Sequence, residues 1–201
     1  MEVSKIHLSS SELELMQNAE IILTKNKILE KMKGLLEEVQ EKQIDFVKQD
    51  LVNNDIFKVS PKISRGENYL GLPYLILDYP RQSCQNNFVF IRTMFWWGNF
   101  FSCTLHIAGN SKKLFSNDIK RSYSELKNHF IGVNNDQWVH HLEDTNFKKI
   151  SSLTKVEFDQ CCDEFEHLKI AGKFSLSEWT NAPLNLFNSW KFYLNICGLI
   201  S

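Results

Sequence analysis

One stretch of the sequence, residues 72–108, limits the fold of this chain more than any other. It reads LPYLILDYPRQSCQNNFVFIRTMFWWGNFFSCTLHIA, and it is rich in the β-branched and aromatic residues that favour strands. Pro80 and Gly98 interrupt it, and a glycine at the first position of a two-residue loop is typical of a type II′ hairpin turn. The sequence therefore predicts a strand over residues 72–79 and an antiparallel β-hairpin over residues 88–108.

Part of this stretch has the composition of a membrane span. Residues 93–111 contain no Asp, Glu, Lys or Arg, and the segment is close to the length that an α-helix needs to cross a bilayer. However, Gly98 lies near its middle, and the polar residues Ser102, Thr104 and His106 follow. A two-stranded hairpin accounts for this interruption and a membrane helix does not, so we expect no membrane contact.

The segment before this stretch is predicted to be helical over residues 9–49. Apolar residues recur from Leu29 to Phe46 at alternating spacings of three and four, which is the pattern of an amphipathic helix that covers a core. Ser9, with Glu12 three residues later, matches a capping box and starts an earlier helix. The two helices are expected to form either an antiparallel hairpin or one long bent helix.

Turn signals and periodicity predict the other segments. Residues 50–70 are expected to form a long loop with a short strand at residues 56–59, so that the sheet region spans residues 56–108. Residues 115–198 are predicted to be mainly helical. The elements are a helix capped by Ser116 or Asn117 that runs through Phe130, a short edge strand over residues 137–142, a helix from Thr154 that ends at Gly172, and an apolar last helix over residues 184–197.

This order of elements predicts one α+β domain over residues 1–201. A small antiparallel sheet, made of the hairpin 88–108 and the strand 72–79, packs against an N-terminal helical hairpin and C-terminal helices. The last helix has few polar positions, so it is either deeply buried or covered by another subunit.

Charge and cysteine content narrow the partners and the compartment. Lys and Arg number 23 and Asp and Glu number 24, for a formal net charge of −1, so the chain lacks the basic excess typical of nucleic-acid binders. The five cysteines form no CxxC pair, and the N-terminus MEVSKIHLSS has no apolar run of a signal peptide. We therefore expect a cytoplasmic protein with free thiols and no nucleic-acid partner.

No motif of a common enzyme class is present. The sequence contains neither a glycine-rich phosphate loop nor GxSxG nor HExxH, so ATPase, dinucleotide-dependent dehydrogenase, α/β-hydrolase and zinc-protease functions lose their usual support. Cys84 with a histidine could serve as nucleophile and base, but no cysteine-hydrolase signature surrounds it. We expect no cofactor and no metal ion.

A two-residue turn at Gly98-Asn99 would fix which side chains share a face of the hairpin. One face would carry Arg92 among apolar residues, and a buried arginine needs an anion. An internal carboxylate such as Asp78 is the favoured partner, and a ligand carboxylate or phosphate is the alternative. The other face would carry hydroxyl groups and a histidine among aromatic residues, as a half-wet pocket wall: Thr93, Ser102, Thr104 and His106.

Two further groups of residues complete the candidate ligand site. Arg and Tyr side chains crowd around the first predicted strand, and guanidinium groups bind carboxylate or phosphate in a bidentate manner. The segment NNDQWVHH adds an aromatic residue and a histidine on one face of its predicted strand. The candidate ligand-binding residues are Arg65, Tyr74, Asp78, Arg81, Arg92, His106, Trp138 and His140.

The sequence supports two functional hypotheses. The first is a binding or protein-interaction module without a catalytic motif, which forms a homodimer or binds a protein partner through an aromatic or C-terminal apolar surface. The second is a small-molecule enzyme or ligand-binding protein whose anionic substrate is held by Arg92 with Arg65 and Arg81, while His106 or His140 moves a proton near neutral pH. The residues leave open whether the chain is an enzyme.

Overall fold

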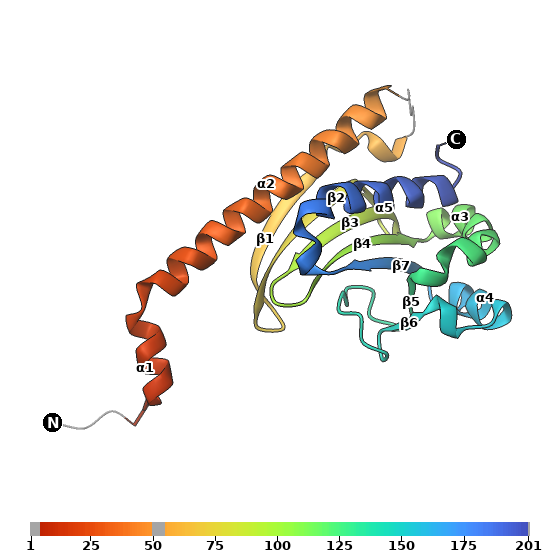
Figure 1. Ribbon diagram of the computed structural model, residues 1–201. Helices are drawn as coiled ribbons and strands as arrows, with labels where there is room; N and C mark the ends of the chain where they lie inside the picture. The colour runs from red at the N-terminus through yellow and green to blue at the C-terminus, as the bar shows by residue number, and fades with distance from the viewer. Residues whose placement is uncertain (1–4, 50–54, 201) are drawn as a thin grey trace.

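The protein is built around one antiparallel sheet of seven strands in the order β1-β2-β3-β4-β7-β5-β6 (Figure 1). The computed structural model describes residues 5–49 and 55–200. Together with the surrounding helices the sheet makes an α+β fold, as predicted, but it is larger than a hairpin plus one strand. The strands are β1 Lys62–Tyr69, β2 Leu72–Cys84, β3 Asn87–Trp96, β4 Phe100–Ala108, β5 Phe130–Gly132, β6 Phe147–Lys149 and β7 His167–Phe174.

Two long helices, α2 Ala19–Gln49 and α5 Ala182–Ile196, cover one face of the sheet (Figure 1). The apolar core lies between them and the strands, because alternate strand residues all point toward the helices. We call this side the helix-covered face. Its fully buried side chains include Leu75, Ile91, Phe101, Leu105, Leu36 and Trp190.

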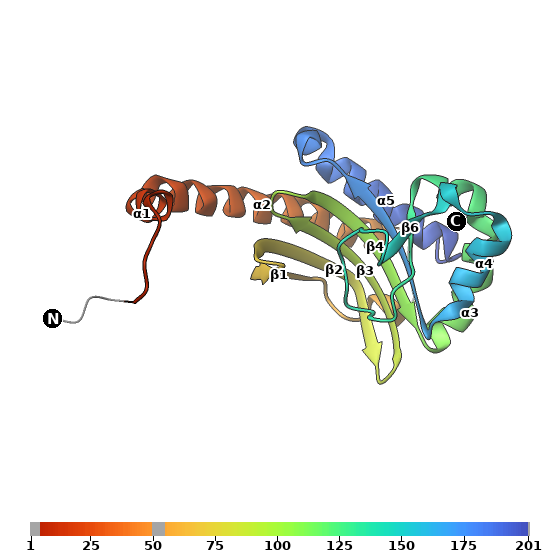
Figure 2. The same ribbon diagram turned by 90° about the horizontal axis from the view of Figure 1, so that it is seen from below.

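The opposite face of the sheet is covered by a loop, residues 133–146, which we call the cover loop (Figure 2). Its polar side chains shape it locally. The Asn134 side-chain oxygen accepts the N–H of Asp136 at 2.8 Å, and the Asp136 carboxylate accepts the N–H of Trp138 at 2.9 Å. The two ends of the loop meet where the N–H of Val133 donates to the carbonyl of Asn146 at 2.8 Å. We call the sheet surface beneath it the loop-covered face.

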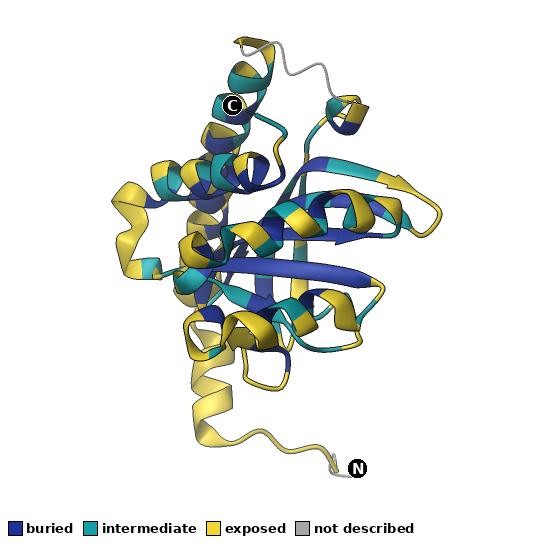
Figure 3. Ribbon diagram, turned by 90° about the vertical axis from the view of Figure 1, so that its right-hand side faces the viewer, coloured by how far each residue is buried: buried dark blue, intermediate teal, exposed yellow. Residues whose placement is uncertain are grey.

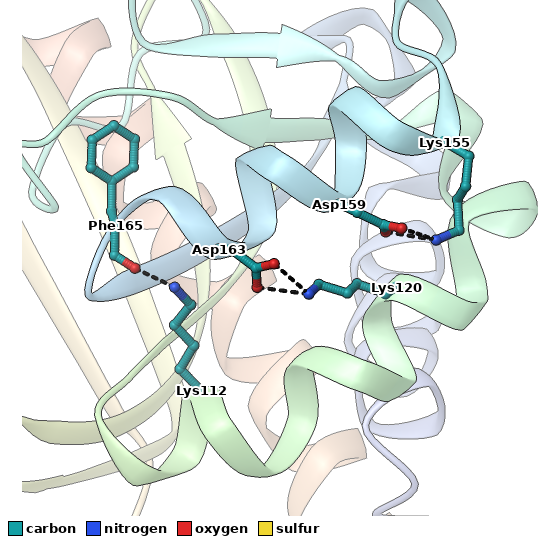
Figure 4. Close-up of polar contacts among 6 residues, drawn as sticks. All are labelled: Lys112, Lys120, Lys155, Asp159, Asp163 and Phe165. Atoms are coloured by element: carbon teal, nitrogen blue, oxygen red, sulfur yellow. Dashed lines mark hydrogen bonds and ion pairs between the residues drawn. The ribbon is translucent and has the colours of Figure 1, made fainter.

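Helices α3 Asn110–Arg121 and α4 Lys155–Glu164 pack together at one end of the sheet. The ammonium of Lys120 on α3 contacts both carboxylate oxygens of Asp163 on α4, at 2.6 and 2.7 Å, and Lys112 donates to the backbone carbonyl of Phe165 (Figure 4). Short 3-10 turns complete the chain: η1 Asp55–Phe57, η2 Ser122–Asn128, η3 Ile150–Ser152 and η4 Leu176–Asn181.

The N-terminal helices confirm the predicted start and correct the predicted arrangement. Helix α1 Ser10–Gln17 begins with the capping box of Ser9 and Glu12, and the apolar stripe of α2 is buried from Leu29 onward. At Asn18 the chain turns away from the line of α2 and does not fold back along it (Figures 1 and 2). The N-terminal helical hairpin is therefore wrong, and the chain forms two separate helices with a break at Asn18 where one long bent helix was the alternative.

The sheet begins earlier and runs further than the turn signals suggested. Strand β1 occupies much of the segment predicted as a loop, whereas residues 56–59, predicted as a strand, lie in and just after the η1 turn. Strand β2 passes through Pro80 to Cys84, with an irregular register between Asp78 and Arg81. A proline interrupts one ladder bond without ending the strand, because the pairing resumes on its far side.

The hairpin between β3 and β4 has a loop of three residues, so the predicted two-residue turn is wrong. Trp96 pairs with Phe100, which leaves Trp97, Gly98 and Asn99 in the loop. Gly98 has a φ of +70°, a conformation that three-residue hairpin loops place on glycine. Every partner on β4 is consequently shifted by one residue, and its side chains exchange faces.

The C-terminal half is less helical than predicted. Thr154 starts a helix as expected, with a capping box formed with Glu157, but this helix, α4, ends at Glu164 and is followed by β7. Residues 137–142 form no strand. Helix α3 starts at Asn110, upstream of the predicted helix; the later part of that prediction forms η2, and its last residue, Phe130, begins β5. Helix α5 matches the predicted last helix; its apolar residues fill the core, so the C-terminal apolar surface expected to contact another subunit is largely internal.

Among the described residues, no helix combines the length and the apolar character that a membrane crossing requires.

Candidate functional site

A group of charged and polar side chains lies on the loop-covered face, near the middle of the sheet. The observed register pairs Arg92 with Asp78 on one side and with Thr104 on the other, and it pairs His106 with Lys169. These residues therefore share one face. The one-residue shift splits the predicted pocket wall: Thr93 joins the core side, whereas Ser102, Thr104 and His106 join Arg92.

The anion that neutralises Arg92 belongs to this chain. Its Nε and Nη2 donate to Oδ1 and Oδ2 of Asp78, both at 2.8 Å, in a bidentate ion pair across neighbouring strands. The side chains of both residues are mostly buried, with 18% and 15% of their surface exposed. Of the two partners expected for Arg92, the internal carboxylate is the one observed.

The third hydrogen bond of Arg92 reaches the cover loop. Its Nη1 lies 2.8 Å from Nε2 of His140. A guanidinium group can only donate, so His140 accepts with Nε2 and carries its proton on Nδ1. Burial, followed by the charges of Lys169 and Arg92, holds the pKa of His140 well below its usual value, which agrees with a neutral ring.

Tyr69, at the end of β1, fixes the same corner of the cover loop. Its hydroxyl oxygen accepts the backbone N–H groups of His140 at 2.7 Å and His141 at 3.2 Å. The hydroxyl proton is directed to Nδ1 of His141, 2.9 Å away. One side chain thus satisfies two backbone donors that would otherwise lack partners beneath the loop.

Lys169 on β7 is the third anchor, and its environment is unusual for a lysine. The residue is 2% exposed, and its ammonium donates to the backbone carbonyls of Gln137, at 3.1 Å, and Val139. Among the described residues, no carboxylate forms an ion pair with it. Burial, and then the charge of Arg92, lowers the pKa of Lys169 to about 7, while the charge of Asp136 acts in the opposite direction.

His106 lies beside Lys169 among aromatic rings. It is 3% exposed, and its ring centroid lies 4.6 Å from that of Phe88, and 5.7 Å from those of both Trp138 and His167. Burial, together with the charge of Lys169, lowers the pKa of His106 to about 2, and no described residue forms a hydrogen bond to its Nε2. A ring with this pKa stays neutral near pH 7, which makes it poorly suited to the proton transfer considered above.

A cavity of about 400 Å³ opens next to this group. Three of its wall residues, Phe88, Trp138 and His167, are the rings that surround His106. Half of the Trp138 surface is exposed, so this indole presents a free face. Polar groups and one exposed acid complete the lining: Ser83, Gln85, Asn86, Gln137 and Glu166, with Phe90, Ala108 and Gly109.

The structure brings together five of the candidate site residues and separates the others. Asp78, Arg92, His106, Trp138 and His140 lie on or over the loop-covered face. Tyr74 is on the same face but belongs to a separate apolar cluster, which includes Ile76, Met94, Trp96 and Phe100.

The three arginines do not converge on one anion. Arg65 pairs with Leu75, whose side chain points into the core, so it lies on the helix-covered face, where it binds Glu67. Arg81 donates to the backbone carbonyl of Ser60 at 2.6 Å. The expected cooperation of Arg65 and Arg81 with Arg92 is therefore not formed.

Two anchors of the site, Tyr69 and Lys169, were missing from the candidates. Lys169 was missed because the segment was predicted to continue a helix. The signal was an alternation of polar and apolar residues in HLKIAGKF, with His167, Lys169 and Lys173 on one side and Leu168 and Ile170 on the other, which is typical of a half-polar strand.

Comparison with known proteins assigns the chain to no family: no family model, curated protein or solved structure matches it. Among the residues that the structure describes, no group of three or more His, Cys, Asp or Glu side chains is arranged to hold a metal ion. The site must therefore be interpreted from its own chemistry.

Proposed function

We propose that this chain is a binding protein for a small aromatic molecule that carries an anionic group, and that the molecule occupies the cavity beside Trp138. The observation that carries the proposal is an aromatic-walled cavity with a buried lysine attached to its wall: the ammonium of Lys169, which has no carboxylate partner among the described residues, donates to the carbonyl of Gln137, a residue that lines the cavity. The proposal extends the anionic-ligand hypothesis but replaces Arg92 with Lys169 as the charge that attracts the ligand.

The size and walls of the cavity support an aromatic ligand. Its volume of about 400 Å³ falls within the range of about 300–1,000 Å³ typical of small-molecule sites. Phe88, Phe90 and Trp138 supply ring surfaces, and the amides of Gln85, Asn86 and Gln137 supply donors and acceptors at its rim. Stacking of aromatic rings adds about 0.5–1.5 kcal/mol beyond area burial.

The charge distribution supports an anionic group. Arg92 and Asp78 neutralise each other, so the positive charge that remains on this face comes from two lysines of β7: Lys173 lies over the ring of Phe100, whereas Lys169 is buried beside His106. A buried charge without a partner is unfavourable, and an anion nearby would reduce this cost. Glu166 also lines the cavity, but it is exposed, so water and salt screen its repulsion.

Binding without catalysis is the form of function that the histidines support. His106 and His140 are buried, and their lowered pKa values keep them neutral at pH 7. His140 already uses Nε2 to accept from Arg92. Neither ring is poised to exchange protons near neutral pH.

Isothermal titration calorimetry with three probes tests the proposal: benzoate, benzamide and benzylamine, which share one ring and differ in charge. We expect benzoate to bind most tightly at pH 6. Its affinity should fall about tenfold per pH unit above pH 7 as Lys169 loses its proton, while that of benzamide stays constant. Tighter binding of benzylamine would mean that Glu166 sets the preference, and the anionic part of the proposal would be wrong.

Two matched tryptophan variants locate the binding site. Trp138→Ala should weaken the binding of both benzoate and benzamide about tenfold, since it removes an exposed ring of the cavity. Trp179→Ala, which removes an exposed tryptophan outside this cavity, should change neither affinity. Lys169→Met should remove the preference for benzoate over benzamide. Unchanged binding in Trp138→Ala would place the ligand elsewhere.

A further inference from the structure

The N-terminal part of the chain exposes more large apolar side chains than any other segment of the structure. We call residues 8–28 the arm; it comprises α1 and the first turns of α2. No residue from position 5 to position 28 is buried, and the arm extends away from the sheet (Figures 1 and 3). Its exposed apolar residues are Leu8, Leu13, Leu15, Met16, Ile21, Ile22, Leu23 and Ile28.

Such a surface calls for a partner. Met16 is 66% exposed and Leu23 is 58% exposed, and each would gain roughly 1.5–3 kcal/mol if it were fully buried. Helix α1 has only 8 residues, and isolated helices shorter than about 12–15 residues are marginal in water. Contiguous apolar surface of this kind marks sites of protein–protein contact.

The body of the molecule has apolar hollows beside the arm. One, of about 570 Å³, lies between α2 and the start of β2, and a second, of about 320 Å³, lies beside Trp179. They share Ile28 and Trp97, and Asn18 at the bend before α2 lines the first. The same chain therefore carries an exposed apolar helix and hollows of matching character.

The charges of the arm, together with those of the next turn of α2 up to residue 33, favour a second copy of the chain as the occupant. Residues 9–20 contain three acids and no Lys or Arg, for a charge of −3, whereas residues 21–33 contain four Lys and one Glu, for a charge of +3. Antiparallel pairing of two arms would set the acidic segment of each copy beside the basic segment of the other. A parallel pairing would set like charges together.

Several of these charges form no ion pair with another residue that the structure describes. Lys25 pairs with Glu67 and Lys33 pairs with Glu37. By contrast, no described residue forms an ion pair with the following four: Glu14, Glu20, Lys27 and Lys31. In a dimer with a two-fold axis every contact occurs twice, so the acidic segment of each copy would contact the basic segment of the other.

We propose that the arm is a dimerisation element: two copies pair their arms antiparallel about a two-fold axis. With the axis near Leu23, α1 of one copy lies beside Ile28 and Met32 of the other, at the hollow lined by Trp97 and Trp179. This surface differs from the aromatic or C-terminal surface expected from the sequence, and the ligand proposal does not depend on it.

Sedimentation equilibrium of the full chain tests the dimer. We expect a mass of two chains of 23.6 kDa each at micromolar concentration. Met16→Asp with Leu23→Asp should shift the equilibrium to the monomer. Leu114→Asp, which charges an equally exposed apolar residue on α3, should leave the dimer intact. A monomeric wild-type chain, or a dimer that both arm substitutions leave unchanged, would overturn the proposal.

Charge reversal then tests the antiparallel arrangement. Glu14→Lys with Glu20→Lys changes the charge of residues 9–20 from −3 to +1, and Lys27→Glu with Lys31→Glu changes that of residues 21–33 from +3 to −1. Each double variant alone places like charges together and should dissociate at least about tenfold more readily at low salt. An equimolar mixture of the two variants restores opposite charges in both segment pairs and should form a heterodimer. Dimers that mixing fails to restore would exclude the antiparallel pairing.

Discussion

The two faces of the sheet are covered by different kinds of structure, and their chemistry differs accordingly. Helices α2 and α5 cover one face, which is almost entirely apolar. The cover loop lies over the other, which carries an ion pair, a buried lysine and a tyrosine hydroxyl. A helix satisfies its own backbone hydrogen bonds and needs only apolar contact, whereas the backbone groups of a loop need partners from the surface beneath it.

The polar residues of the loop-covered face follow this requirement closely. Tyr69 receives two backbone N–H groups of the loop, and Lys169 donates to two of its carbonyls. Arg92 holds the ring of His140. The side chains of Tyr69, Arg92 and Lys169 therefore hold the cover loop in place. The aromatic cavity follows from where the loop places Trp138.

The largest expected effect lies on the helix-covered face. Leu36→Ala removes a fully buried side chain from α2, and it should lower the free energy of unfolding by about 2–5 kcal/mol. Urea denaturation followed by circular dichroism measures this loss. Leu184→Ala, at an exposed position of α5, is the matched control and should change stability by less than about 0.5 kcal/mol. A small loss in Leu36→Ala would mean that the helices pack loosely on the sheet.

On the loop-covered face, the largest effect should come from the ion pair. Asp78→Ala leaves the Arg92 guanidinium without its carboxylate and should cost about 3 kcal/mol, at the lower end for a buried pair because both groups are partly exposed. Adding Arg92→Met should recover part of this loss, since an apolar side chain then replaces the unpaired charge. If the double variant were as unstable as Asp78→Ala, Asp78 would act through a partner other than Arg92.

Acid should weaken the loop-covered face selectively. The pKa of His106 is about 2 in the folded chain and about 6.5 when unfolded, so the unfolded state binds the extra proton between these values. Stability should therefore fall as the pH drops below 6.5, by up to about 1.4 kcal/mol per unit for this group. Comparing the wild type with His106→Gln from pH 6.5 to pH 4.5 isolates the contribution. Parallel stability curves would show that His106 is protonated without penalty.

The smallest effect tests the loop contacts themselves. Tyr69→Phe keeps the ring but removes the acceptor for the N–H groups of His140 and His141, and it should cost about 1–2 kcal/mol. Hydrogen exchange should quicken at these two amides while the amides of β3 and β4 stay protected. Faster exchange throughout the sheet would mean that the hydroxyl stabilises the whole fold.

Local rules in the sequence predicted two helix starts and one apolar stripe. The starts at Ser9 and Thr154 and the apolar stripe of α2 depend on neighbouring residues, and all three are present. The length of the β3–β4 loop was not predictable in this way, because a two-residue and a three-residue loop both accept a glycine. The strands β5, β6 and β7 pair with residues distant in sequence or are very short, so they left weak signals.

The candidate site was predicted in part for a related reason. Residue chemistry alone selected Asp78, Arg92, His106, Trp138 and His140, since a charged or aromatic residue in such surroundings needs a partner. Placing them together required the strand register and the path of the cover loop, which only the tertiary structure supplies. Arg65 was misassigned because side-chain alternation on β1 sends it to the other face.

The three-residue loop at Trp97, Gly98 and Asn99 sets which residues of β4 pair with β3, and so which face of the sheet each β4 side chain occupies. An odd loop directs Phe101, Cys103, Leu105 and Ile107 to the core and Ser102, Thr104 and His106 to the cover loop. Removing one loop residue while keeping both strands would invert this assignment and offer hydroxyl groups to α5 and aliphatic groups to the loop. The length of this one short loop therefore decides which face of the sheet carries the apolar side chains of β4 and which face carries its polar side chains.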